Sequence, residues 1–309
     1  MSMKFLIPLL AFSLLIGCDG EKSNVAPSEG PIEEAASETK PTEAVSVENP
    51  NLKYVIEGDA VTITGCDKKA SGELIIPAMI EGKPVTKIEE EAFLLFTNLT
   101  SITIPDSVNS IGENTFWNCT SLTNVTIGNG VTSIGERAFN GCTSLTSITI
   151  PDSVNSIGEK AFWECASLTS ITIPDGVTSI GKQAFYNCTS LTSITIPDGV
   201  TNIGGITFMG CSSLTSITIP DIVTSIGDTA FSNCTSLTSI TIPDGVTGIG
   251  GLAFLGCSSL TTVTFLGDVP KIANNTFLES SPTIYREADA KGWSDTLAGR
   301  PVKLITEKP

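Results

Sequence analysis

The sequence contains no histidine, and this absence removes several kinds of chemistry at once. Histidine is the usual general base near neutral pH, the partner of serine or cysteine in nucleophilic pairs, and the commonest ligand of transition metals. The repeated carboxylates fall in turn sequences, where water solvates them. No acid–base pair or activated nucleophile is indicated, so we expect neither an enzyme nor a bound cofactor.

Basic residues are also scarce in this chain. It has 17 Lys and Arg against 33 Asp and Glu, which gives a formal net charge of −16 at pH 7. Contacts with nucleic-acid phosphates require clustered Lys and Arg, and the sequence has no basic stripe. The composition therefore argues against a nucleic-acid partner.

No apolar run in the sequence is long enough to span a bilayer. The run from Phe5 to Ile16 follows Lys4 and falls short of the roughly 20 residues that a membrane helix needs, so residues 1–17 fit a cleaved export signal. The tetrapeptide "LIGC", residues 15–18, resembles the lipobox of bacterial lipoproteins. This resemblance implies that Cys18 is acylated and that the protein meets a membrane through that lipid only. The other interpretation is a buried N-terminal strand with an incidental cysteine.

The segment after Cys18 has almost no large apolar side chains and is rich in Glu, Ser, Thr, Ala and Pro. Such a segment cannot bury enough surface to offset its ordering entropy, so we expect a flexible acidic tether over residues 18–50. Asp19 resembles the signal that keeps some bacterial lipoproteins at the inner membrane. We expect an exported, lipid-anchored envelope protein at the outer membrane or cell surface, with inner-membrane retention left open by Asp19.

From Phe93 onward the sequence repeats every 23 residues. One column of the repeat is always phenylalanine, and a second column is cysteine in seven consecutive units. The phenylalanines are Phe93, Phe116, Phe139, Phe162, Phe185, Phe208, Phe231, Phe254 and Phe277, and the cysteines are Cys119, Cys142, Cys165, Cys188, Cys211, Cys234 and Cys257. A single unit of this length cannot enclose its own apolar face, so the period predicts a solenoid of stacked units.

The unit "LTSITIPDGVTSIGKQAFYNC", residues 168–188, shows how one turn is built. Alternation over residues 170–173 predicts a strand that ends at Pro174, and "VTSIG" predicts a second extended piece. At Gly181 we expect a sharp bend or a positive φ angle. The spacing of apolar residues in "KQAFYNC" predicts one short helical or 3₁₀ turn.

The recurring pattern "LxxIxIPxxVxxIGxxAFxxC" resembles the BspA-like bacterial branch of the leucine-rich repeats over residues 74–277. The resemblance implies a curved, right-handed leucine-rich-repeat solenoid with a parallel sheet on its concave side and short extended and 3₁₀ or helical turns on its convex side. It also implies adhesion or partner recognition at a bacterial surface, which is an analogy from fold and family.

The ends of the chain depart from the period, as caps do. Residues 51–73 contain two alternating apolar runs joined by "EGD" and predict a hairpin cap. The solenoid is expected over residues 74–280, and its first unit is lengthened before Val85. Residues 281–309 are expected to form a C-terminal cap, in which residues 282–299 suggest a last strand and a short helix. We expect a monomer.

The cysteine column raises the question of disulfides or a metal. Ladder positions about 4.8 Å apart fit poorly the Cβ separation of about 3.8 Å that a disulfide needs. No CxxC pair and no histidine accompanies the column, so zinc is not indicated. We therefore expect free, buried thiols. The aspartates in the turns, such as Asp175 and Asp198, are expected to accept hydrogen bonds from the main chain of their own turn rather than to bind calcium.

Two surfaces are candidates for binding. The first is a row of outward hydroxyl groups on the strands, which suits a smooth soluble face or weak, repeated contact with a glycan. Its threonines are Thr126, Thr149, Thr172, Thr195, Thr218 and Thr241.

The second candidate surface is the column directly after the phenylalanines, where the repeats stop agreeing. Here stand Trp117, Trp163, Tyr186 and Met209, which are residue types enriched at interfaces. These side chains either pack over neighbouring turns or form a patch that docks a partner.

The expected function is binding of other macromolecules, as adhesion or protein–protein recognition, with host matrix proteins or glycans as the partners. The alternative is a structural scaffold lipoprotein of the envelope or periplasm that has no host ligand.

Overall fold

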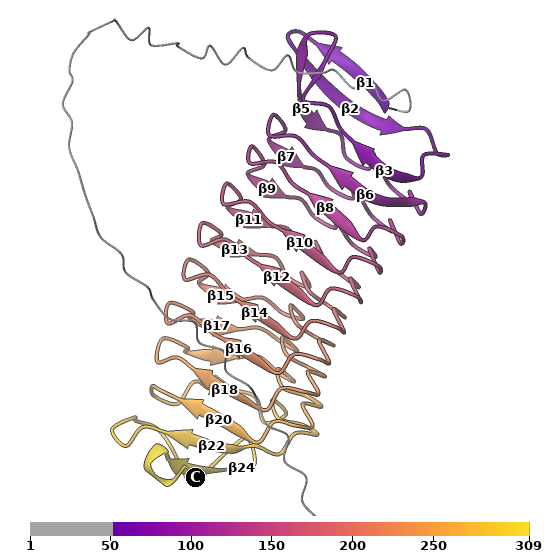
Figure 1. Cartoon of the computed structure of the whole chain (residues 1–309). Helices are drawn as coiled ribbons and strands as arrows, with labels where there is room; N and C mark the ends of the chain where they lie inside the picture. Colours follow the sequence, from indigo (N-terminus) through magenta and orange to yellow (C-terminus); the bar gives the residue numbers. More distant parts are fainter. Residues whose placement is uncertain (1–51, 309) are drawn as a thin grey trace, which may run out of the picture. The chain divides into compact units, whose positions relative to one another are not determined.

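Each 23-residue unit closes one turn of a solenoid, and the turns stack through main-chain pairs between equivalent residues (Figure 1). The computed structural model describes residues 52–308. Ile148 pairs with Ile171 in one sheet, and Ile157 pairs with Ile180 in another, so both registers advance by one repeat per strand. The solenoid of stacked units predicted from the period is confirmed. The predicted signal peptide, Cys18 and the tether over residues 18–50 lie outside the described residues.

The longer strands form the main ladder of the solenoid in two sheets. The seven-stranded parallel sheet contains β3 (Gly72–Ile75), β6 (Leu99–Thr103), β8 (Asn124–Thr126), β10 (Ser147–Thr149), β12 (Ser170–Thr172), β14 (Ser193–Thr195) and β16 (Ser216–Thr218). The five-stranded sheet contains β18 (Ser239–Ile242), β20 (Thr262–Phe265), β22 (Thr283–Arg286), β24 (Arg300–Leu304) and β23 (Thr296–Leu297). The ladder is therefore interrupted between β16 and β18.

Two-residue strands form a second ladder after the turn that contains proline. Its sheets contain β7 (Ser110–Ile111), β9 (Ser133–Ile134), β11 (Ser156–Ile157) and β13 (Ser179–Ile180), then β15 (Asn202–Ile203), β17 (Ser225–Ile226), β19 (Gly248–Ile249) and β21 (Lys271–Ile272). In both ladders the isoleucines of the regular repeats, such as Ile171 and Ile180, point inward and are buried, as the alternation predicts, whereas Ile75 in β3 is 46% exposed.

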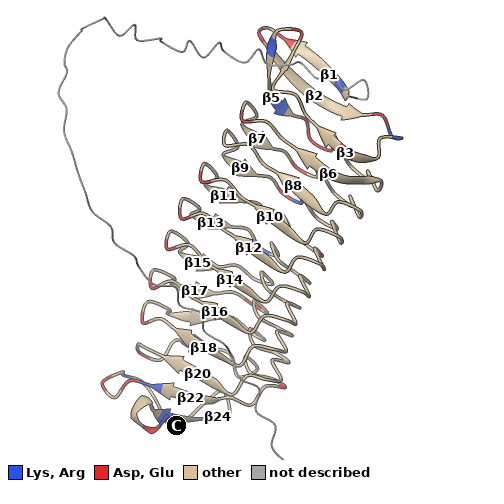
Figure 2. Cartoon of the chain, viewed as in Figure 1, with Lys and Arg blue, Asp and Glu red and all other residues tan. Residues whose placement is uncertain are grey.

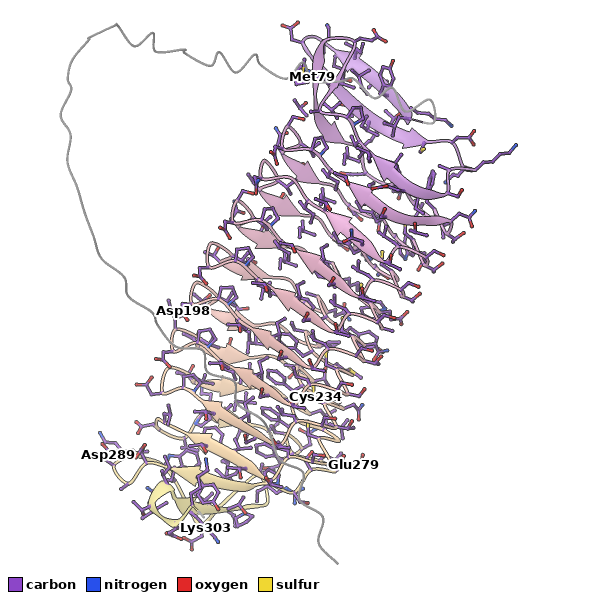
Figure 3. All side chains as sticks on the ribbon, in the orientation of Figure 1. Met79, Asp198, Cys234, Glu279, Asp289 and Lys303 are labelled. Carbon is purple, nitrogen blue, oxygen red and sulfur yellow. The ribbon has the colours of Figure 1, made fainter. Side chains whose placement is uncertain are left out.

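The core is built from columns of identical side chains, one from each turn. Consecutive phenylalanine rings of the column that begins at Phe93 lie 5.2 to 5.6 Å apart with planes 2 to 13° from parallel. Because all of these rings are buried, each turn contributes apolar contacts to both of its neighbours. Cys234 lies inside this stack, whereas Asp198 and Glu279 lie at opposite edges of the turns (Figure 3).

In each repeat, the segment after the glycine equivalent to Gly181 forms consecutive turns and not a helix. In one unit, the N–H of Tyr186 donates to the carbonyl of Gln183, and the N–H of Cys188 donates to the carbonyl of Phe185. This is the 3₁₀ hydrogen-bond pattern, but Gln183 and Asn187 have φ angles of 62° and 53°. Left-handed residues at these two positions stop the turns from joining into a helix.

Gly181 does not have a positive φ angle, so that alternative of the sequence interpretation is wrong. A Cβ atom at this position would lie 2.4 Å from the main-chain nitrogen of Glu159 in the preceding turn. This position requires glycine because the main chains of two successive turns approach each other too closely here to admit a side chain.

The N-terminal end carries a hairpin made of β1 (Leu52–Glu57) and β2 (Ala60–Cys66), which pair antiparallel. Strand β2 continues in parallel onto β5 (Lys83–Ile88), and β4 (Met79–Ile80) pairs antiparallel with β5. The hairpin therefore covers the edge of β5, the strand that precedes β7 at the N-terminal end of the second ladder.

The C-terminal end is closed by strands rather than by the predicted short helix. Residues 282–299 contain β22 and β23, and β23 folds back antiparallel on β24. The 3₁₀ helix η1 (Ile305–Glu307) follows β24. Within residues 52–308, no helix has the length and apolar character needed to cross a membrane.

Candidate binding surfaces

In most repeats the residue after the phenylalanine lies at the outer edge of a turn, where the main chain holds it in place, but Ser232 in this column is buried. The N–H of Glu164 donates to the carbonyl of Tyr186 at 2.8 Å, and the N–H of Asn187 donates to the carbonyl of Met209 at 2.8 Å. These bonds join successive repeats, so side chains of this column follow one another along the solenoid.

The structure brings Trp163 and Tyr186 into direct contact. Their ring centroids lie 3.9 Å apart with planes 25° from parallel, and both side chains are half-buried. The ammonium group of Lys160 lies 5.9 Å from the centroid of the Trp163 ring and also bonds Glu159 at 2.9 Å. The pair thus packs on the solenoid and still presents ring surface to solvent.

The other two members of the column are set apart from this pair. Trp117 is 36% exposed and stands two repeats before Trp163, with half-buried Asn140 in the repeat between them. Met209 stands one repeat after Tyr186 and is half-buried. The predicted aromatic patch is therefore a stacked pair with one separate, more exposed tryptophan.

The hydroxyl row predicted on the strands is exposed. Its threonines alternate with buried isoleucine or valine, and neighbouring rows pair in register, as Thr149 does with Thr126 and Thr172. Strands β8 to β18 carry no charged residue on this face, which Figure 2 shows as a band without blue or red. Within residues 52–308, the hydroxyls of this row bond no other protein group. They are therefore open to a ligand or to water.

A second set of threonines has a different role. The hydroxyl of Thr169 donates to the carbonyl of Thr146 at 3.2 Å, and the hydroxyl of Thr192 donates to the carbonyl of Thr169 at 3.2 Å. Each of these hydroxyls bonds the equivalent threonine of the preceding turn. This column therefore strengthens the stack and is not a binding surface.

A hollow interrupts the hydroxyl face at the break between β16 and β18. It has a volume of about 280 Å³ and is lined by Ser216, Thr218, Asp221, Ser239, Thr241 and Leu266, with isoleucines at its base. Sequence reasoning missed it because these hydroxyls match those of every other repeat. One signal stood nearby: Ile222, 51% exposed, replaces the glycine that Gly176 and Gly245 supply at this turn position.

Comparison with known proteins agrees with this architecture. A family model described as the BspA type leucine rich repeat region, with 6 copies, matches residues 76–191 and 155–283, which together span more than half of the chain. The chain belongs to the BspA-type leucine-rich repeat family. None of the curated proteins compared with it matches.

Two crystal structures resemble this BspA-type solenoid. The leucine-rich repeat protein of T. pallidum is 31% identical, with a TM-score of 0.58, over 61% of this chain and 89% of that chain. A leucine-rich repeat protein from Bacteroides ovatus is 28% identical, with a TM-score of 0.63, over 82% of this chain and 75% of that chain. Both likenesses support the solenoid assignment.

The seven cysteines of the repeat column are free and buried, as predicted, and Cys66 in the N-terminal hairpin is free and buried as well. The structure adds a bond that the sequence did not suggest: the thiol of Cys188 donates to the carbonyl of Phe162 at 3.2 Å. Ser280 occupies the same column one unit after Cys257, and its hydroxyl donates to the carbonyl of Phe254 at 2.6 Å. The column is therefore a row of buried donors.

Burial also sets the acidity of these thiols. Loss of solvation raises the pKa of Cys211 to about 12 and raises the pKa of Cys188 well above its usual value. Such thiols are poor nucleophiles and poor metal ligands. Within residues 52–308, no group of three or more acidic or cysteine side chains is placed to hold a metal ion.

Within residues 52–308, Asp175, Asp198 and the other aspartates of this column accept no hydrogen bond from the main chain of their own turn, so the prediction of such bonds is wrong. The carboxylate of Asp106 accepts the N–H of Asn129 at 2.7 Å, which belongs to the next repeat and not to its own turn. Here the aspartate joins two units of the stack.

Proposed function

We propose that this chain is a lipid-anchored protein of the bacterial envelope that binds other macromolecules, proteins or glycans, through the surface of its solenoid. Membership of the BspA-type family supports a role in adhesion or protein binding. The observation that carries the proposal is the stacked pair of Trp163 and Tyr186, half-exposed at the edge of turns whose other columns hardly vary. Rigid, partly exposed aromatic side chains are the residues that most often anchor protein partners.

The test is a binding screen of the chain against host matrix proteins and glycans, followed by substitution of the pair. Trp163→Ala with Tyr186→Ala is expected to abolish binding of the identified partner and to leave the fold intact. Asn140→Ala, in the same column, is the control and is expected to bind normally. Unchanged binding by the double variant would reject the aromatic pair as the anchor.

The alternative, an envelope scaffold with no host ligand, is favoured by Asp19. Protease treatment of intact cells separates the two functions. An adhesin is cleaved while the outer membrane is whole, whereas a periplasmic scaffold is cleaved only after that membrane is breached.

A further inference from the structure

In the main ladder, strand pairing is interrupted at one place, between β16 and β18. The hydroxyl face has a hollow at this interruption. Elsewhere on this face, equivalent residues such as Ser147 and Ser170 pair directly, and the hydroxyls form an even surface. At the interruption, Ser216 and Thr218 on one strand stand opposite Ser239 and Thr241 on the next without ladder pairing. The hollow thus has two walls of hydroxyl groups.

The chemistry of the lining restricts what this hollow can hold. Asp221 supplies its only charge, so an anionic ligand would meet repulsion and no compensating Lys or Arg. Calcium requires six to eight oxygen ligands with several carboxylates, and one carboxylate does not meet that requirement. An apolar ligand would remove water from four hydroxyls and a carboxylate without replacing their hydrogen bonds, which is unfavourable.

A neutral sugar fits each part of the same lining. Its hydroxyls can both donate to and accept from the serine and threonine hydroxyls, which bond no other protein group within residues 52–308. Two neighbouring sugar hydroxyls can donate to the two oxygens of Asp221. The apolar C–H face of the ring can lie on Leu266, which is 40% exposed, and on the isoleucines at the base.

We propose that the hollow between β16 and β18 is a binding site for one unit of a neutral saccharide, held by Asp221 and the four flanking hydroxyls. Its volume of about 280 Å³ is slightly below the range of pockets that enclose drug-sized ligands, so it suits a single sugar ring. Further units of a polymer would extend along the exposed hydroxyl row. The site is separate from the aromatic pair, so the two proposals succeed or fail independently.

The repeat supplies matched controls for the experiment. Asp175 occupies the position of Asp221 two repeats earlier, and Thr172 occupies the position of Thr218, where the ladder is continuous. The variants to compare are therefore Asp221→Asn with Asp175→Asn, and Thr218→Val with Thr172→Val. All four residues are exposed, so thermal unfolding is expected to be unchanged in each variant.

Binding is measured on the full chain by calorimetry, with neutral oligosaccharides of glucose, galactose, mannose and N-acetylglucosamine as probes and with sialylated and sulfated chains as anionic probes. We expect binding of a neutral probe, at least about a tenfold loss of affinity in Asp221→Asn, and no loss in Asp175→Asn. Thr218→Val is expected to weaken binding and Thr172→Val to leave it within twofold.

Three results would overturn the proposal. The first is that no neutral probe binds. The second is that the variants at Asp221 and Asp175 change affinity equally, which would assign binding to the uniform face. The third is that anionic probes bind more tightly than neutral ones.

Discussion

At Gly181 the main chain of the preceding turn occupies the space that a side chain would need. An added Cβ atom would lie 2.5 Å from the carbonyl carbon of Gly158. It would also lie 2.4 Å from the nitrogen and 2.7 Å from the Cα atom of Glu159. All three are main-chain atoms of the preceding turn, which cannot rotate away. Gly248 is different: it lies in β19, and an added Cβ atom would meet nothing within 4 Å.

This contrast gives a prediction for two substitutions of the same type. Gly181→Ala is expected to lower the free energy of unfolding by about 3 kcal/mol, because the turns must separate to admit the methyl group. Gly248→Ala is expected to be neutral or to stabilise by about 0.5 kcal/mol, since it only restricts the unfolded chain. Urea unfolding of both variants is the measurement. Equal effects at the two positions would contradict the close-approach explanation.

The sequence predicted the direction of individual side chains well and the main-chain angles poorly. Ile171 and Phe185 are buried because alternation and periodicity report which side of the chain avoids water. The left-handed angles at Gln183 and Asn187 were not predicted. Gln183 and its equivalents include no glycine, so the residue type at that position gives no signal of the angle.

From residue 91 to residue 256, each turn segment contains two left-handed positions, and they differ in the residues that they accept. The column of Asn187 consists mainly of asparagine and glycine, which tolerate a positive φ angle. The column of Gln183 includes Ile206, with a φ angle of 65°, although β-branched residues are strongly disfavoured there. The N–H of Ile206 donates to the carbonyl of Asp228 in the next turn at 2.9 Å, and this bond helps to hold the strained angle.

The strain at this turn can be tested by substituting the residues at two equivalent left-handed positions. Ile206→Asn is expected to raise the free energy of unfolding by about 1 kcal/mol, because asparagine adopts the left-handed region more readily. Gln183→Ile, at the equivalent position one repeat earlier, is expected to lower it by a similar amount. Thermal unfolding of the two variants against the parent chain provides the comparison. A loss of stability in Ile206→Asn would show that side-chain packing outweighs the strain.

The short helix predicted in the C-terminal cap is absent from residues 282–299, and the helical or 3₁₀ turn predicted for "KQAFYNC" is a pair of successive turns with 3₁₀-type hydrogen bonds. In "KQAFYNC" the buried positions Ala184, Phe185 and Cys188 fit a helical period, but the same spacing serves two successive turns. In the C-terminal cap, the side chain of Trp293 packs edge-on against Phe265 from a loop, with no helix in residues 282–299. Short apolar spacing does not distinguish one helical turn from turns that the neighbouring repeat holds in place.

At the scale of the whole molecule, the cysteine column makes stability depend on pH. In the folded protein burial raises the pKa of these thiols from 9.0, to about 12 for Cys211 and Cys257. Below the unfolded value both states keep their protons, so this contribution to stability is fully present. As the pH rises above that value the unfolded chain releases protons first, and the contribution is lost toward the folded pKa.

We therefore expect the free energy of unfolding to fall above about pH 9, by about 1.4 kcal/mol per pH unit for each buried thiol. Denaturant unfolding under reducing conditions, from about pH 8 to about pH 11, measures the slope. Cys188→Ser is the matched variant, because a serine in this column keeps the donor bond, as Ser280 shows. Its slope is expected to be smaller by one proton. Identical slopes in the variant and the parent would contradict the role assigned to burial.

The repeat predicted the stack as a whole but not the places where its ladders are interrupted, which are between β16 and β18 in the main ladder and between β13 and β15 in the second. The six exposed threonines were identified from alternation alone, because every repeat provides the same pattern. The interruption between β16 and β18 involves Ser216, Thr218 and their equivalents in the next unit, which are the residue types found in continuous repeats. Small shifts between turns arise from packing over several units, and a single unit of sequence does not record them.

The constant register of 23 residues has a consequence for the length of the molecule. A duplicated unit placed between Cys165 and Cys188 would meet the same neighbours on both sides, because Ser156 already pairs with Ser179 in the way that a new strand would pair with either. Each duplication would extend the reach of the solenoid by about 4.8 Å and leave both ends unchanged.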